Sequence, residues 1–191
     1  MIKKIIFFVL VVIVGSILFS PKIDISNSKN YYEDNSKEIT ELIKIYKQIQ
    51  KKQNFGFGYL DNDYKEYLAQ IYGDSTRYIY KSEITKDQIF DEIKESNLTR
   101  EDLELISKQI KKAKAIWIDS EDIYLSGYHQ KGTVISLKAQ AINAPFTPTR
   151  FYTLLIMDDL QSIRLKEDEL ANFNIHEIEP GIYQTISNQF R

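Results

Sequence analysis

The hydrophobic period of the chain changes at Ala115, and no other feature constrains the fold as strongly. Before Ala115, apolar residues recur every three to four positions, as they do along one face of a helix. After it, they recur at every second position, as they do in strands. Helical segments followed by a run of strands predict an α+β domain, with helices packed on one face of an antiparallel sheet.

Four segments before Ala115 have the pattern of amphipathic helices behind a capping residue. They cover residues 35–52, 63–73, 85–93 and 99–112. A loop is predicted at NFGFGYLDND (residues 54–63) and a short strand at RYIYKS (residues 77–82). The helix after Thr99 is the clearest, because its apolar residues form a single stripe: Leu103, Ile106 and Ile110.

The segments after Ala115 predict successive strands separated by turns. They are AIWI (115–118), DIYLSGY (122–128), TVISLKAQAI (133–142), RFYTLLIM (150–157) and two short strands joined by a turn at Pro180–Gly181. In the third, the alternation predicts one buried face and one solvent-facing face, with Ser136 on the latter. The fourth is apolar on both faces and is expected to lie centrally or under the helices. In outline, helices before such a meander resemble the cystatin-like and NTF2-like architectures.

The N-terminus carries a segment that favours insertion into a membrane. Lys3 and Lys4 precede an uncharged apolar run, and Pro21 and Lys22 follow it. This pattern predicts a segment whose N-terminus stays in the cytoplasm. No small residues suited to a signal peptidase stand directly behind the run, so we expect an uncleaved signal anchor. A cleaved signal peptide and a buried core helix are the alternatives.

These features divide the chain into three parts. Residues 1–21 are predicted to be a signal anchor or signal peptide, 22–35 a polar tether, and 36–191 a single extracytoplasmic α+β domain. The expected location is a single pass through the inner (cytoplasmic) membrane by residues 5–21, with the C-terminal domain outside the cytoplasm. If the segment is cleaved, the protein is periplasmic or secreted.

Composition argues against several classes of ligand. The 25 basic and 27 acidic residues leave a net charge of −2 and no basic stripe, so nucleic acid is not an expected partner. The chain has no cysteine, which excludes disulfides, cysteine-based zinc sites and a lipid-modified cysteine. No metal site and no cofactor are expected.

No set of residues forms a recognisable catalytic group, so an enzyme is not expected. His129 falls in a predicted turn, and His176 begins HEIEP, which lacks the second histidine of a zinc-hydrolase motif. A small exported hydrolase that uses carboxylates stays an alternative. Its acids would be Asp158, or Glu121 with Asp122, and one of them would need to be buried with a raised pKa.

Aromatic residues are the remaining unusual feature of the sequence. Phe55, Phe57 and Tyr59 alternate with glycines in the predicted loop, while Tyr124 and Tyr128 fall on one face of a predicted strand. Because tyrosine is enriched in protein interfaces, these five residues predict a surface that binds a partner protein. The alternative is that the rings complete the core.

The resulting hypothesis is a non-enzymatic protein-binding domain anchored in the membrane. Its partner would be another protein in the cell envelope or outside the cell, within an envelope-assembly, secretion or host-interaction system. An immunity or inhibitor protein that blocks a toxin acting on the envelope is a second possibility of the same class.

Overall fold

The computed structural model of the chain describes residues 25–74, 77–81, 89, 91, 93–94, 96–125, 128–137, 151–157 and 175–187. The predicted membrane segment, the predicted cap at Thr85, the end of the third predicted strand and Asp158 lie outside these residues. The elements in chain order are α2 (Ile25–Gln50), β1 (Phe55–Tyr59), β2 (Tyr67–Ile71), β3 (Arg77–Lys81), α4 (Arg100–Lys112), β4 (Ala115–Leu125), β5 (Tyr128–Leu137), β6 (Phe151–Met157), β7 (His176–Glu179) and β8 (Ile182–Ser187).

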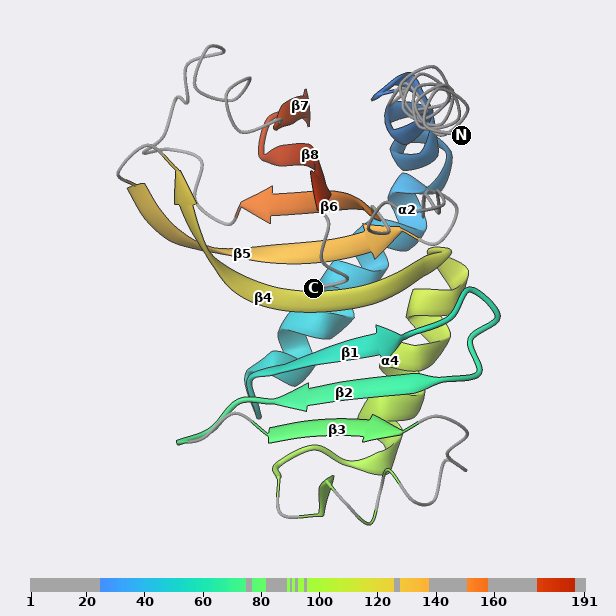
Figure 1. Cartoon of the computed structure of the whole chain (residues 1–191), viewed down its shortest axis with the longest axis vertical. Helices are drawn as coiled ribbons and strands as arrows, with labels where there is room; N and C mark the ends of the chain where they lie inside the picture. The colour runs from blue at the N-terminus through green and yellow to red at the C-terminus, as the bar shows by residue number, and fades with distance from the viewer. Residues whose placement is uncertain are drawn as a thin grey trace, which may run out of the picture.

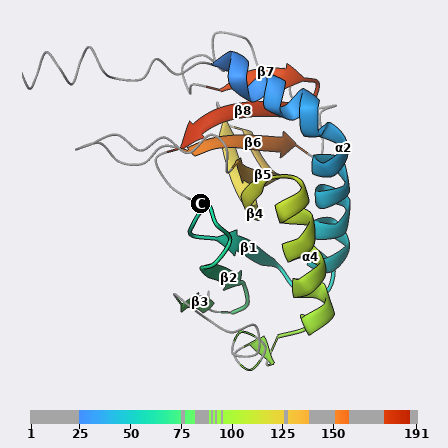
Figure 2. The ribbon, with the colours of Figure 1, turned by 90° about the vertical axis from the view of Figure 1, so that its right-hand side faces the viewer.

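The strands form one eight-stranded sheet in the order β3-β2-β1-β4-β5-β6-β8-β7, and every neighbouring pair is antiparallel. Figure 1 shows the strands one above the other, and Figure 2 shows α2 and α4 together on one side of them. The predicted α+β class, with helices packed against an antiparallel sheet, is therefore confirmed. Within the described residues, no helix is long and apolar enough to cross a membrane.

The main core lies between the helices and the sheet. It is built from residues that are at most 1 % exposed, contributed by both helices and by the central strands: Ile39, Leu42, Tyr46, Phe57, Ile106, Ile110, Ile118, Ile135 and Leu154. A smaller cluster covers the other face of β5, β6 and β8 and includes Val134, Leu155 and Tyr183. Apolar side chains on both faces explain why β6 is buried along almost its whole length, as predicted for RFYTLLIM.

The predicted helix after Thr99 is confirmed as α4. Thr99 and Asp102 form a capping box, in which the Thr99 hydroxyl accepts from the Asp102 N–H and the Asp102 carboxylate accepts from the Thr99 N–H. The predicted stripe is buried, with Leu103 at 3 % and Ile106 and Ile110 at 0 % exposure. Lys52, just after α2, donates to the same Asp102 carboxylate at 2.8 Å, which joins the ends of the two helices.

The prediction of a polar tether over 22–35 is wrong from Ile25 onward, because α2 begins there. Two helical stretches meet at Asn35, whose dihedral angles are non-helical and whose side chain donates to the Tyr31 carbonyl, so the stretch predicted from Asn35 onward does begin there. The hydroxyls of Tyr31 and Tyr32 donate to the Ala113 carbonyl and the Glu179 carboxylate. Two buried tyrosines therefore fasten a polar-looking segment to the domain.

The predicted loop at 54–63 and the predicted helix at 63–73 are also wrong, since they form the β1–β2 hairpin. Tertiary packing decides this local structure. A Cβ atom at Gly58 would lie 2.1 Å from the Ile116 carbonyl oxygen, and one at Gly56 would lie 2.6 Å from the Trp117 ring. The alternation of large and absent side chains thus belongs to a strand whose glycine face lies against β4.

The strands β4 and β5 are longer than predicted and form a single hairpin. Residues 119–121, predicted as a turn, continue β4, and His129, also predicted in a turn, lies in β5 opposite Tyr124. Ser136 was expected to face solvent but is 1 % exposed, because both faces of β5 are covered there. The predicted strand at 77–82 is confirmed as β3, and the turn at Pro180–Gly181 joins β7 to β8 with Gly181 at φ 88°.

Candidate functional site

The β4–β5 hairpin extends beyond the rest of the sheet. On one side β1 pairs with β4 only at Trp117 and Ile118, and on the other β6 pairs with β5 only at residues 132–136. From Ser120 to Leu125 and from Tyr128 to Lys131, each strand pairs only with the other among the described residues. We call these residues the ribbon. Its projection past β6 is visible in Figure 1.

An exposed aromatic group occupies the outer part of the ribbon. The ring of Tyr124 lies 4.6 Å from that of His129, centroid to centroid, with an angle of 16° between the planes. His129 Nε2 lies 3.1 Å from Asp122 Oδ1 on the same face. Tyr124 is 70 % exposed, and Leu105 on α4 is a second exposed large apolar residue, at 42 %.

The five aromatic residues predicted to form one binding surface are not brought together. Phe55, Phe57 and Tyr59 are at most 1 % exposed and face the helices. The Phe55 ring lies 5.1 Å from that of Tyr46 on α2, and the Tyr59 ring lies 4.9 Å from that of Tyr64 in the β1–β2 turn, both measured between ring centroids. These three residues therefore belong to the core, and the prediction that they form a binding surface is wrong. The prediction that Tyr124 and Tyr128 share a strand face is also wrong. Residues directly opposite each other in an antiparallel pair lie on the same face, and Tyr128 is opposite Leu125, the neighbour of Tyr124. Successive residues of a strand face opposite sides, so Tyr128 lies on the other face from Tyr124.

Acidic and phenolic groups gather at the base of the ribbon, where β4 leaves β1. Asp119 is 1 % exposed, and its carboxylate accepts from the Tyr72 hydroxyl at 2.6 Å and from the Ser120 N–H at 2.7 Å. Burial raises the pKa of Glu121, which lies two residues further on the same strand face. Burial, followed by the negative charge of Asp119, raises the pKa of Tyr46 above its ordinary range.

Sequence reasoning missed this cluster because DSE (119–121) was interpreted as a turn. A useful signal was available in Asp119, which directly follows the apolar run AIWI. If the strand continues, Asp119 lies two residues after Trp117 and therefore on the same face. Tyr72 carried no such signal, since its contact with Asp119 joins residues 47 positions apart.

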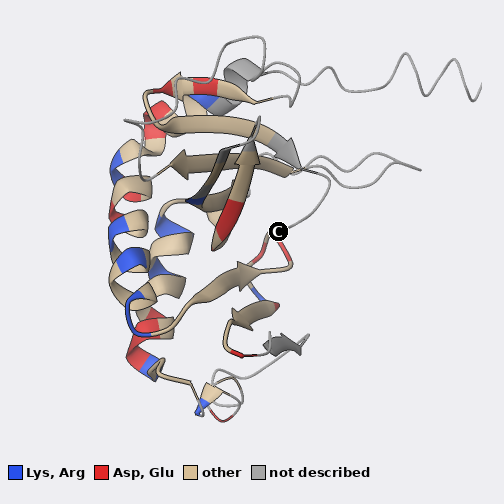
Figure 3. Ribbon diagram, turned by 90° about the vertical axis from the view of Figure 1, so that its left-hand side faces the viewer, with Lys and Arg blue, Asp and Glu red and all other residues tan. Residues whose placement is uncertain are grey.

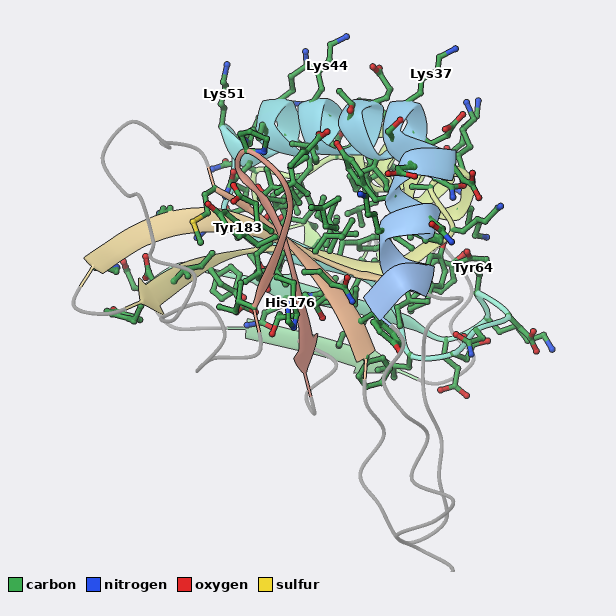
Figure 4. The ribbon with its side chains drawn as sticks, turned by 90° about the horizontal axis from the view of Figure 1, so that it is seen from above. Lys37, Lys44, Lys51, Tyr64, His176 and Tyr183 are labelled. Carbon is green, nitrogen blue, oxygen red and sulfur yellow. The ribbon has the colours of Figure 1, made fainter. Side chains whose placement is uncertain are left out.

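The other candidates identified in the sequence are less organised. His176 is half-buried on the edge strand β7, and Figure 4 shows it well away from the ribbon. An open depression on α4 is lined by Glu104, Ser107, Lys108, Lys111 and Lys112. Among the described residues, no three metal-ligating side chains come together.

Comparisons with known proteins give no further guide to the site. No protein-family model, no curated protein and no solved structure matches the chain.

Proposed function

We propose that the protein binds another protein through the ribbon, and that residues 5–21 hold it in the membrane with this domain outside the cytoplasm. The exposure of Tyr124 supports the proposal most directly. A ring that is 70 % exposed on a projecting hairpin leaves a large apolar area in water. Its burial in a complex would be favourable, and tyrosine combines that apolar area with a hydroxyl that can hydrogen-bond at the rim.

The surroundings of Tyr124 also suit an interface. Stacking on His129 restricts the rotation of the ring, so less side-chain entropy is lost when a partner covers it. Asp122 in turn fixes the imidazole from the neighbouring strand. The three side chains come from two strands with continuous pairing, and this gives a rigid group rather than a mobile loop.

A photoreactive phenylalanine analogue at position 124 tests the proposal in the membranes of the protein's own host. The matched control carries the analogue at Leu105, the other exposed large apolar position. We expect a discrete product at 124 that is absent at 105. An excess of the unmodified full chain should compete it away, whereas an excess of the Tyr124→Ala chain should not. Equal labelling at both positions, or equal competition by both chains, would contradict the proposal.

A carboxylate-dependent hydrolase is the second candidate, and the raised pKa of Glu121 favours it. A carboxyl group with a raised pKa can serve as a general acid when a second carboxylate is near it, and Asp119 lies two residues away on the same strand face. Its test is the effect of substitutions on any hydrolysis found for the full chain. Glu121→Gln should abolish that activity, and Asp122→Asn, an exposed neighbour on the opposite face, should leave it intact.

A further inference from the structure

The outer edge of β4 loses its neighbour where the ribbon begins. The register between β4 and β5 is continuous from Trp117 to Leu125, while β1 is paired only up to Ile118. An edge of this kind presents backbone N–H and C=O groups that can pair with a further strand. Among the described residues, no strand occupies this position beside Ser120–Leu125.

One hydrogen bond shows which way the backbone groups of β4 point. The N–H of Ser120 donates to the carboxylate of Asp119 at 2.7 Å, and so it faces away from β5. Successive N–H groups in a strand point to opposite sides, which places those of Asp122 and Tyr124 on the outer edge as well. The pairing between β1 and β4 ends at Ile118, and the unpaired edge begins directly after Asp119.

The charged residues of β4 itself are all acidic, and Lys131 on β5, opposite Asp122, is the basic residue nearest to them in the strand register. Asp119, Glu121 and Asp122 lie on β4, and β4 contains no basic residue. Figure 3 shows this acidic stretch on the strand. By contrast, Figure 4 shows three lysines that point away from the sheet, Lys37 and Lys44 on α2 and Lys51 directly after it. A strand that pairs with β4 would therefore be favoured by basic side chains and opposed by acidic ones.

A second copy of the same edge does not meet this requirement. The β4 strand of another copy contains acidic but no basic residues, so it offers no complementary charge in any register, and some registers place acids opposite acids. Like charges directly opposite each other destabilise a strand pair. The occupant with complementary chemistry is an extended segment of a different protein.

We propose that an extended, basic segment of the partner adds to the outer edge of β4 as a further strand, beside Asp122 and Tyr124. This inference rests on the proposed function and names the chemistry of the partner. Backbone hydrogen bonds to the outward groups of Asp122 and Tyr124 would supply affinity, and the side chains would supply selectivity. With basic residues on the face that Asp122 and Tyr124 share, one would lie next to Asp122, and the apolar stem of the next would cover the free face of the Tyr124 ring.

The probes are capped five-residue peptides added to the full chain in nanodiscs of uncharged phosphatidylcholine. The parent peptide is Lys-Val-Lys-Val-Lys, and Glu-Val-Glu-Val-Glu is its acidic counterpart. Two further versions of the parent are N-methylated at alternate residues, one on the lysines and one on the valines. Hydrogen exchange measures protection of the Asp122 and Tyr124 amides, and fluorescence anisotropy of labelled peptide measures affinity.

We expect the basic parent to bind and to protect both amides, and the acidic peptide not to bind. One N-methylated version should bind like the parent, and the other should lose affinity about tenfold or more, since its methyl groups would replace the N–H groups facing β4. Asp122→Asn should weaken binding of the parent, whereas Asp63→Asn, an exposed acid in the β1–β2 turn, should not. Equal binding of both methylated peptides would show attraction by charge alone and would overturn the proposal. So would the absence of protection.

The two proposals fail in distinguishable ways. If photo-crosslinking at position 124 captures a partner but no basic peptide protects the edge, the ribbon binds by another mode and the strand-addition proposal is wrong. If the peptides bind as expected but position 124 captures nothing in the host membrane, the edge is competent and the proposed cellular function is wrong.

Discussion

Two regions of the molecule carry aromatic residues in opposite environments. The rings of β1 are at most 1 % exposed under the helices, whereas Tyr124 on the ribbon is 70 % exposed. The difference follows from what surrounds each strand. β1 has β2 and β4 on its two sides and α2 and α4 over one face, whereas β5 is the one strand beside the outer part of β4 among the residues that the structure describes. Exposure of aromatic residues thus depends on sheet position and not on aromatic content.

The largest expected effect is that of Phe57→Ala on stability. Removal of this ring from the main core should lower the free energy of unfolding by about 4 kcal/mol, because the cavity cannot be refilled by its neighbours. Urea unfolding of the full chain in detergent micelles measures it. Phe57→Leu is the control, with an expected loss below about 1.5 kcal/mol. A loss under about 1 kcal/mol for Phe57→Ala would mean that β1 is not a core strand.

Gly58→Ala should have the next largest effect, about 3 kcal/mol of destabilisation. The added methyl group would lie 2.1 Å from the Ile116 carbonyl oxygen, and backbone cannot move aside as a flexible side chain can. The same unfolding measurement applies. Gly73→Ala, at an exposed glycine without a positive φ, should change stability by less than about 0.5 kcal/mol. A harmless Gly58→Ala would contradict the close approach of β1 and β4.

Thr99→Ala should destabilise the protein by about 1 kcal/mol, because it removes the hydroxyl that accepts from the Asp102 N–H at the start of α4. Thr99→Ser keeps this hydroxyl and should retain most of the stability. If the two variants were equally stable, the capping box would contribute nothing to the folding of the helical layer.

The stability contributed by Asp102 should depend on pH. Burial opposes its ionisation, but the hydrogen bonds from Lys52 and Thr99 outweigh burial and hold the pKa of Asp102 below its ordinary value of 3.8. Its contribution is therefore present above about pH 4 and is lost as the pH falls through the lowered pKa. Between pH 5 and pH 2, wild type should lose more stability than Asp102→Asn. Parallel pH profiles for the two chains would contradict this.

Tyr124→Ala should have the smallest effect on folding, less than about 0.5 kcal/mol, because the ring is mostly in water in the free protein. Its effect on partner capture should nevertheless be large, a loss of tenfold or more if the ring is central to the interface. A substantial loss of stability would show that the Tyr124 ring packs within the free protein. The contrast between a solvent-exposed Tyr124 and the buried β1 rings would then be wrong.

The sequence predicted those features that depend on local pattern. The period change at Ala115 indicated the fold class, and the capping residue Thr99 placed the start of α4 within one residue. The turn at Gly181 was also predictable, because few residues other than glycine adopt its positive φ. In each case the energetic preference resides in residues close together in the chain.

The sequence did not predict features set by distant contacts. β1 looked like a flexible loop because its glycines are required by Trp117 and Ile116, almost sixty residues away. The segment Ile25–Asp34 looked like a tether because the partners of Tyr31 and Tyr32 lie far away in the chain, at the end of α4 and on β7. The ribbon was missed for a related reason. Its acidic residues at 119–121 have a composition typical of a turn, and only the pairing of β4 with β5 shows that they continue a strand.

Hydroxyl-radical footprinting of the full chain tests the central contrast most directly. It compares oxidation of Tyr124 with that of Phe55, Phe57 and Tyr59, first in the purified protein and then in the membranes of its host. The account predicts rapid oxidation of Tyr124 in the purified protein, protection of Tyr124 in host membranes, and little oxidation of the β1 rings in either. Oxidation of the β1 rings, or equal oxidation of Tyr124 in both states, would contradict it.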